Sequence, residues 1–198
     1  MEEILISTGS DANIYMCKFL GKNVVKKVIY RKFYRHKTID KKIRKLRISN
    51  EIKFTKRLTS LNIDVPILYF IDMEEKSLFF EYIKGCTINN ILKNIIEYVP
   101  NIAKAVGIIL AKIHNGGVIH GDFTTSNLML RNSYIYKNKI YNYKDNTSYE
   151  FSDIKNIKLC VIDFGLSFLS STVEVCSVKK KKKEKKKKKE KKKKKKKK

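Results

Sequence analysis

The chain has 198 residues and a formal net charge of +26 at pH 7, from 45 Lys and Arg against 19 Asp and Glu. Residues 179–198 hold 18 Lys and two Glu, so they carry +16 of that total. Such a run repels itself and has no apolar surface to bury, so we expect a disordered tail over 177–198. The longest apolar run, around Val106–Leu110, is too short to span a bilayer, which excludes a membrane-spanning protein and predicts a soluble one.

Cysteine usage indicates a reducing compartment. The four cysteines lie far apart, no pair has metal-ligand spacing, and no signal peptide is recognisable before them: Cys17, Cys86, Cys160 and Cys176. This excludes a disulfide-rich secreted domain and favours a cytoplasmic or nuclear protein.

The first part of the chain has the alternation and turn residues of an antiparallel sheet. Strands are expected over Ile4–Ser7, Asn13–Phe19 and Val24–Tyr30, with a polar turn, Thr8–Ala12, between the first two. A long basic helix follows, predicted by apolar residues at spacings near three and four: Ile39, Ile43, Leu46, Ile52, Leu58 and Leu61. Two further strands, Ile67–Asp72 and Ser77–Tyr82, are expected to form a hairpin that ends at Gly85.

The second part is predicted to be mainly helical. Thr87 can cap one helix, and a second begins after Pro100 and ends at Gly116 and Gly117. Two short strands are expected over Asn127–Leu130 and Lys158–Ile162. Between them, residues 132–157 have no hydrophobic period and are interpreted as a low-complexity surface insertion.

Two short motifs carry the chemistry. The first places Asp122 after His120-Gly121 and Asn127 five residues later, and the second is Asp163-Phe164-Gly165. Each is common alone, and an Asp-Gly turn beside a buried Asn would explain the first. Their order along the chain is specific and favours phosphoryl transfer: a helix is followed by an Asp in a loop, an Asn, a strand and then Asp-Phe-Gly. That reaction needs charge neutralised and oxygens aligned, and Mg²⁺ takes few protein ligands, all of them oxygens.

These motifs resemble the signature of the protein-kinase superfamily. They most closely resemble the PRPK family, the kinase-like subunit of the KEOPS complex that modifies tRNA. Three stretches carry the resemblance, which covers about residues 4–170 without the insertion: His120–Asn127, Ile162–Phe168, and Tyr34-Arg35-His36 leading to Arg47–Glu51. The resemblance implies an α+β, bilobal kinase-like fold, with an N-lobe over 1–85 and a minimal, apparently truncated C-lobe over 86–176.

The resemblance also implies residue roles in binding ATP and Mg²⁺. Lys27 would hold the phosphates and pair with Glu51, Asp122 would be the catalytic base, and Asn127 and Asp163 would bind the metal. The residues that would contact the rest of the nucleotide are the turn residues Thr8, Gly9 and Ser10 and the hinge residues Glu81 and Ile83.

The sequence departs from the kinase pattern at several places. The covering turn has one glycine, and Gly121 replaces the usual arginine, so no phosphorylation switch of an activation loop is expected. Lys26 and Lys27 are adjacent and point to opposite faces of a strand. Counting back from Tyr34-Arg35-His36 without a gap favours Lys27 as the phosphate-binding lysine, but one inserted residue would favour Lys26. Only about a dozen residues separate Gly165 from the lysine run, so the C-lobe is expected to be truncated or completed by a partner.

Three functions remain open. The first is an atypical Ser/Thr kinase or ATPase that serves threonylcarbamoyladenosine modification of tRNA. It would act beside the threonylcarbamoyl-transferring subunit and other KEOPS-like subunits, and would contact tRNA through its basic surface and tail. The second is a RIO-type or small-molecule kinase, against which the Tyr-Arg-His and Thr-Thr-Ser-Asn stretches argue. The third is a nucleotide-binding scaffold that binds RNA without catalysis.

Overall fold

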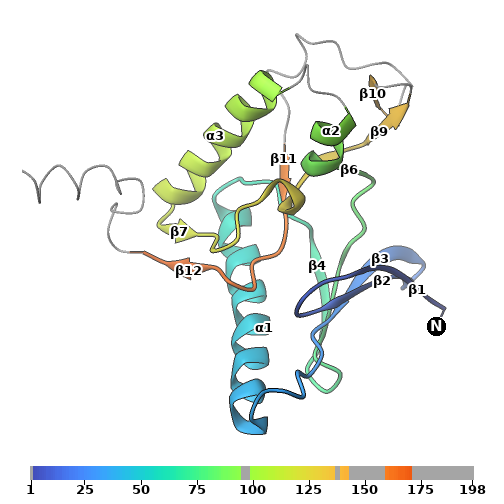
Figure 1. Ribbon diagram of the computed structural model, residues 1–198, viewed down its shortest axis with the longest axis vertical. Helices are drawn as coiled ribbons and strands as arrows, with labels where there is room; N and C mark the ends of the chain where they lie inside the picture. Colours follow the sequence, from blue (N-terminus) through green and yellow to red (C-terminus); the bar gives the residue numbers. More distant parts are fainter. Residues whose placement is uncertain (1, 95–98, 137–138, 143–158, 171–198) are drawn as a thin grey trace, which may run out of the picture.

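The N-terminal strands form one antiparallel sheet in the order β1-β2-β3-β5-β4. The computed structural model describes residues 2–94, 99–136, 139–142 and 159–170 (Figure 1). The strands of this sheet lie within one or two residues of the segments expected from the sequence: β1 (Glu3–Thr8), β2 (Asn13–Phe19), β3 (Lys22–Val28), β4 (Leu68–Asp72) and β5 (Ser77–Glu81). The predicted β-rich N-terminal part is confirmed.

Helix α1 (Lys37–Ser60) joins the two halves of the molecule. Its Ile48 packs with Leu78 and Phe80 of the sheet. Phe54 and Leu58, further along the helix, belong to a second and larger core that holds the C-terminal elements. Figure 1 shows that α1 runs from beside the sheet up to the other helices, so this one helix packs in both cores.

The buried face of α1 agrees only in part with the apolar spacing: Leu58 is buried and Ile52 packs against the sheet core, as the spacing predicts. Ile39 and Leu46 are 55% and 60% exposed, whereas Asp40 and Glu51 are buried at 1% exposure. Asp40 can be buried because its carboxylate accepts hydrogen bonds from Arg44 Nε and from a backbone N–H. Two paired carboxylates therefore lie on the core face, and an apolar count could not find that face.

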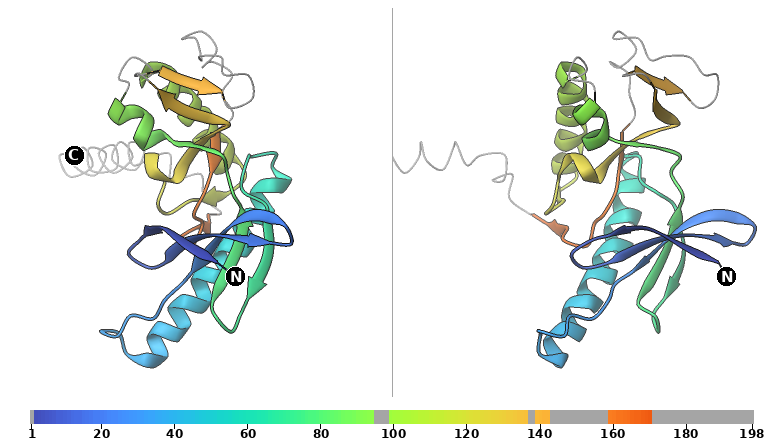
Figure 2. Two further views of the ribbon diagram at one scale, coloured as in Figure 1. Left: turned by 90° about the vertical axis from the view of Figure 1, so that its right-hand side faces the viewer. Right: turned by 45° about the vertical axis from the view of Figure 1, so that its right-hand side comes forward.

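Among the described residues, the C-terminal part consists of small sheets and two helices, α2 (Ile88–Asn94) and α3 (Val99–Asn115) (Figure 2). One sheet has the order β11-β8-β6, a second pairs β12 with β7, and a third pairs β9 with β10. Their bounds are β6 (Gly85–Thr87), β7 (Val118–Ile119), β8 (Leu128–Arg131), β9 (Ser133–Tyr136), β10 (Lys139–Asn142), β11 (Leu159–Val161) and β12 (Phe168–Leu169). A 3₁₀ turn, η2 (Thr125–Asn127), precedes β8. The α+β class expected from the sequence is confirmed, while the lobe boundary at residue 85 stays a prediction.

Gly85 begins a strand that the sequence analysis missed. Instead of only ending the hairpin, it pairs with Arg131 of β8. A Cβ at Gly85 would lie 2.1 Å from the carbonyl oxygen of Leu130, so this close approach of two backbones requires glycine. The predicted cap is present, because the N–H of Asn90 donates to Thr87 Oγ1 at 3.2 Å.

Part of the expected low-complexity insertion is ordered and packed. β9 and β10 form a hairpin, and Ile140 is fully buried in the larger core. Ser133 is also buried: its hydroxyl donates to the carbonyl of Leu130 at 2.7 Å and accepts from the N–H of Cys86 at 3.2 Å. The expectation of a low-complexity surface insertion was wrong for this part of the segment, because Ser133 and Ile140 are buried. Residues 143–157 of the insertion, Cys176 and the tail at 177–198 lie outside the described residues.

Candidate active site

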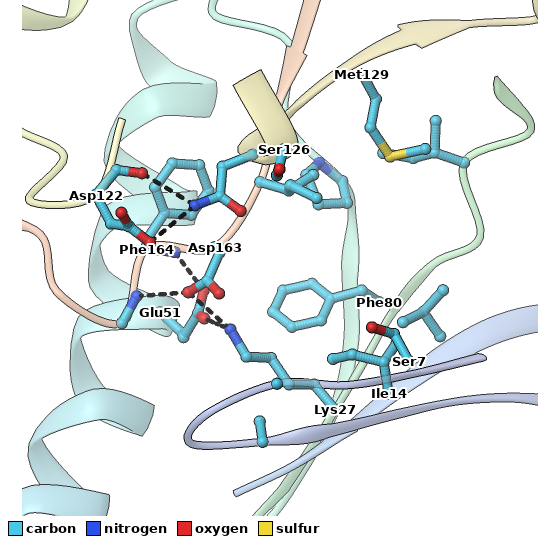
Figure 3. A pocket seen from close by; sticks show the side chains of 18 of the residues that line it. Ser7, Ile14, Lys27, Glu51, Phe80, Asp122, Ser126, Met129, Asp163 and Phe164 are labelled. Atoms are coloured by element: carbon cyan, nitrogen blue, oxygen red, sulfur yellow. Dashed lines mark hydrogen bonds and ion pairs between the residues drawn. The ribbon is translucent and has the colours of Figure 1, made fainter. Parts of the chain in front are cut away.

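A cavity of about 650 Å³ lies between the sheet and the C-terminal elements. Ile14 and Phe80 from the sheet and Met129 and Ile162 from the C-terminal part supply apolar walls, and charged side chains gather at one end (Figure 3). Small-molecule sites in proteins have this size and this division into apolar wall and few polar groups. An apolar slot of this kind suits a flat aromatic ring.

Lys27 is the centre of the charged end. Its Nζ forms an ion pair with Glu51 Oε1 of α1 and another with Asp163 Oδ1 at 2.9 Å (Figure 3). The second oxygen of Glu51 accepts the backbone N–H of Phe164 at 2.9 Å. Glu51 therefore ties β3, α1 and the Asp163-Phe164-Gly165 segment together.

Burial and pairing shift the pKa values of all three groups. Burial disfavours the charge on Lys27, but Glu51 and Asp163 outweigh it, so the pKa of Lys27 is raised. The pKa of Asp163 is lowered because Lys27 outweighs the effect of burial. Burial raises the pKa of Glu51, which Lys27 opposes and the nearby charge of Asp163 reinforces. Lys27 and Asp163 are thereby held in their charged forms at neutral pH.

The structure separates the two adjacent lysines. Lys26 lies on the other face of β3, where its Nζ pairs with Glu3 at 2.8 Å and Glu75 at 2.7 Å. Lys27 alone of the two lines the cavity. The geometry thus agrees with Lys27, the residue that counting along the sequence favoured.

Asp163 has a left-handed backbone, with φ of 65°. Such a conformation costs free energy in a non-glycine residue and is concentrated at functional sites. The preceding residue is fixed, because the N–H of Ile162 donates to the carbonyl of Asn127 at 3.0 Å. This bond brings the two expected metal ligands onto neighbouring segments.

Asp122 and Asn127 face each other. Asn127 Nδ2 donates to the carbonyl of Asp122 at 2.9 Å and to its Oδ2 at 3.1 Å, and the Asp122 side chain is exposed to the cavity (Figure 3). Because both bonds use Nδ2, the amide oxygen of Asn127 remains available as a ligand. That oxygen and the Asp163 carboxylate are the donor types that Mg²⁺ takes, so the residues fit this ion. Among the described residues there is no group of three or more His, Cys, Asp or Glu with metal-site geometry.

His120 positions the Asp122 loop, a role that the sequence analysis did not assign. Its ring is buried, with Nε2 at 3.1 Å from the carbonyl of Ile162 and Nδ1 accepting the N–H of Asp122 at 3.3 Å. These bonds require the neutral tautomer with the proton on Nε2. Burial lowers the pKa of His120, which favours this neutral form.

Gly121 has a structural reason to replace the usual arginine. Its φ is +83°, and a Cβ would lie 2.3 Å from the carbonyl oxygen of Leu166. No side chain fits there without moving the segment that follows Asp163.

The expected nucleotide-contacting residues have different positions. Gly9 and Ser10 line the cavity, as do Glu81 and Ile83, whereas Thr8 ends β1 and is not among the lining residues. The turn is closed by the N–H of Gly9 donating to the carbonyl of Ala12 at 2.9 Å.

The hinge is held by a residue that sequence reasoning missed. Arg131 binds both carboxylate oxygens of Glu81, at 2.6 and 3.1 Å, and its Nε pairs with Asp64 at 2.7 Å. The Glu81 side chain is therefore committed to Arg131 and to the N–H of Ile67, so a ligand at the hinge would meet the backbone of Glu81–Ile83 rather than this carboxylate. No local signal marks Arg131, because its partners lie 50 and 67 residues away in sequence.

Comparisons with known proteins agree with this geometry. The family model described as the RIO domain matches residues 14–150. The KEOPS complex subunit Bud32 of Pyrococcus abyssi is 30% identical over 86% of this chain and 70% of its own length. The chain belongs to the Bud32 family. The expected membership of the PRPK family, another name for this one, is confirmed. The match to the RIO-domain model shows that the Tyr-Arg-His and Thr-Thr-Ser-Asn stretches do not set the chain apart from RIO-type kinases.

Other Bud32 relatives extend the match. The EKC/KEOPS complex subunit bud32 of Dictyostelium discoideum is 33% identical over 86% of this chain and 62% of its own length. A probable bifunctional tRNA threonylcarbamoyladenosine biosynthesis protein of Methanobrevibacter smithii is 42% identical over 64% of this chain but only 22% of its own length. The chain thus spans less than two thirds of these two relatives.

A solved structure supports the fold alone. The Rio2 kinase of Chaetomium thermophilum, in a complex titled ADP/Mg²⁺-phosphoaspartate, matches with a TM-score of 0.57 at 16% identity. The match covers 85% of this chain and 48% of that one. The kinase-like fold expected for this chain is therefore confirmed. Within the part of the chain that the structure describes, no helix has the length and apolarity to cross a membrane.

Proposed function

We propose that the chain is an ATP-dependent phosphotransferase that transfers or hydrolyses the terminal phosphate of ATP. The observation that carries this proposal is the convergence of Lys27, Glu51 and Asp163 with the Asp122–Asn127 pair at one end of one cavity. The Rio2 complex with ADP and Mg²⁺ supports the choice of nucleotide and ion.

In the proposed mechanism, Lys27 binds the phosphates and Glu51 fixes its position. The turn that contains Gly9 and Ser10 covers the phosphates, and the backbone of Glu81–Ile83 meets the adenine edge. Asn127 and Asp163 would hold Mg²⁺, and the bound ion would neutralise charge on the phosphate oxygens. A general base must lie within hydrogen-bond reach of the attacking group, and the exposed carboxylate of Asp122 is available to accept the proton of a hydroxyl or water.

The cellular role that we propose is support of threonylcarbamoyladenosine modification of tRNA in a KEOPS-like assembly. The names of the Dictyostelium and Pyrococcus relatives support the assembly, and the bifunctional Methanobrevibacter relative supports action beside the threonylcarbamoyl-transferring subunit. Contact with tRNA would use the basic face of α1, where Lys41, Lys42 and Lys45 are exposed, together with the lysine-rich residues 179–198.

The test of the enzymatic proposal is Mg²⁺-dependent ATP hydrolysis by the full chain, with Asp122→Asn as the variant. We expect turnover to fall by about 10²–10⁴, the usual contribution of a positioned base, while ATP affinity stays within about threefold. Glu74→Gln, which changes an exposed carboxylate in the β4–β5 turn, is the control. Wild-type turnover in Asp122→Asn would contradict the proposal.

A further inference from the structure

The turn between β1 and β2 is anchored to the rest of the N-terminal part by its tip residue. Asp11 pairs with Arg47 Nη2 at 3.0 Å and with Arg35 Nη2 at 3.6 Å. The hydroxyl of Tyr30 donates to the carbonyls of Gly9 at 2.8 Å and Ser10 at 3.1 Å. Tyr30 and Arg35 therefore contact this turn independently of Arg47.

Arg47 lies inside the candidate active site. It precedes Glu51 by four residues on α1, so the two side chains share one face of the helix. Arg47 lines the cavity together with Lys27 and Asp163, and its Cβ lies 3.8 Å from the position of a Cβ added at Gly165. It is thus wedged between the covering turn and the metal-binding segment.

The guanidinium of Arg47 has unused donor capacity. Its Nε is buried and has no hydrogen-bond partner among the described residues. A buried donor without an acceptor is unfavourable, and such a group in a cavity wall indicates a ligand. The planar fork of arginine matches the oxygens of a phosphate group.

The charge balance of the site also calls for this cation. The carboxylates that line the cavity near Lys27 belong to Asp11, Glu51, Asp122 and Asp163. Lys27 is already shared between two of them, and a bound Mg²⁺ would offset only part of the negative charge of a triphosphate, so a further positive side chain is favourable. Arg47 is the additional positive side chain on the cavity wall among the described residues.

We propose that Arg47 is a phosphate-binding residue of this site, which binds the terminal phosphate of ATP and is held by Asp11 when no nucleotide is present. On binding, the guanidinium exchanges the Asp11 carboxylate for phosphate oxygens, while Arg35 and Tyr30 keep the turn closed. This inference rests on the proposed ATP-dependent function. It adds a residue four positions before Glu51 to the expected site.

The test compares ATP and ADP affinities, measured by calorimetry with Mg²⁺ on the full chain. Arg47→Met should weaken ATP binding about tenfold, the effect of one charge-assisted hydrogen bond, and ADP binding by less than about threefold. Arg47→Lys, which keeps the charge, should recover part of the loss. Asp11→Asn, which removes the carboxylate shared by Arg47 and Arg35, should weaken ATP binding by less than Arg47→Met, because Arg47 is kept and the Tyr30 hydroxyl still holds the turn. Lys45→Met, an exposed lysine on the same helix, is the control.

The alternative is that Arg47 only holds the turn. In that case Arg47→Met and Asp11→Asn would weaken binding equally, and ATP and ADP would lose affinity alike. Either result would overturn the inference while leaving ATP binding by the wild type intact. A wild-type chain that binds neither nucleotide would instead overturn the proposed function, and the inference with it.

Discussion

At the scale of single residues, the site depends on which of two neighbouring lysines faces inward. Strand alternation places Lys26 and Lys27 on opposite faces, but it does not say which face α1 covers. The structure answers this through Glu51, which reaches β3 from α1. Sequence reasoning found Asp122, Asn127 and Asp163 more easily because their motifs are short and ordered.

Lys27→Met should weaken ATP binding by about tenfold or more, because Lys27 is the lysine that lines the cavity. Lys26→Met should stay within about threefold, since its partners Glu3 and Glu75 lie on the outer face of the sheet. Fluorescence titration with a labelled ATP analogue measures both. An equal loss in the two variants would contradict the assignment.

Arg131, Arg47 and His120 could not have been assigned from sequence. The partners of Arg131 and Arg47 are brought near only by the packing of β8 and α1. Arg131 lies in no short motif, and although Arg47 begins the stretch Arg47–Glu51, that stretch does not show which groups Arg47 meets. His120 was visible as part of His120-Gly121-Asp122, but its bond to the carbonyl of Ile162 depends on where β11 ends. Residues that position a site are therefore harder to predict than residues within its motifs.

At the scale of secondary-structure elements, the hairpin β9–β10 is the main disagreement with the sequence. Its Asn, Tyr and Lys residues have no helical period, and a four-residue strand gives too little alternation to be recognised. Ile140 packs the hairpin into the larger core, and the buried Ser133 joins it to Leu130 and Cys86. Helix α1 shows a similar failure, since its core face contains paired carboxylates.

Ile140→Ala should lower the free energy of unfolding by about 2–5 kcal/mol, the cost of removing a fully buried isoleucine side chain. The neighbouring Lys139 is exposed, so Lys139→Ala should change the free energy of unfolding by less than about 0.5 kcal/mol. Urea unfolding followed by circular dichroism measures both. Equal stability of the two variants would show that the hairpin does not pack on the core.

The Glu81–Arg131 contact links β5 to β8 and should make stability depend on pH. Burial opposes ionisation of Glu81, but its bonds to Arg131 outweigh this and lower its pKa below the ordinary 4.5. The unfolded chain then binds the proton more readily, so this stabilisation is present above pH 4.5 and is lost as the pH falls through the lowered pKa.

Glu81→Gln should therefore unfold at a lower temperature than the wild type near pH 7, and this difference should shrink as the pH falls below about 4. Thermal unfolding of both proteins across this range is the measurement. Glu74→Gln, which lacks such a contact, should follow the wild type. A difference that stays constant with pH would exclude a charge-dependent role for Glu81.

At the scale of the whole molecule, one helix connects two cores, and the cavity lies where they meet. α1 contributes Ile48 to the sheet core and Phe54 and Leu58 to the other, while Glu51, between them, reaches Lys27. The position of the sheet relative to the C-terminal part is thus set by the same element that sets the charge pair. The sequence predicted the two parts but not that α1 is shared between them.

The central claim is that the cavity binds ATP with Mg²⁺ held by Asp163, and ATP binding with and without Mg²⁺ tests it most directly. Calorimetry on the wild type should give higher ATP affinity when Mg²⁺ is present. In Asp163→Asn this gain should disappear, because a charged ligand of the ion is lost, whereas Asp122→Asn should keep it. An Asp163→Asn variant with the same Mg²⁺ dependence as the wild type would contradict the account.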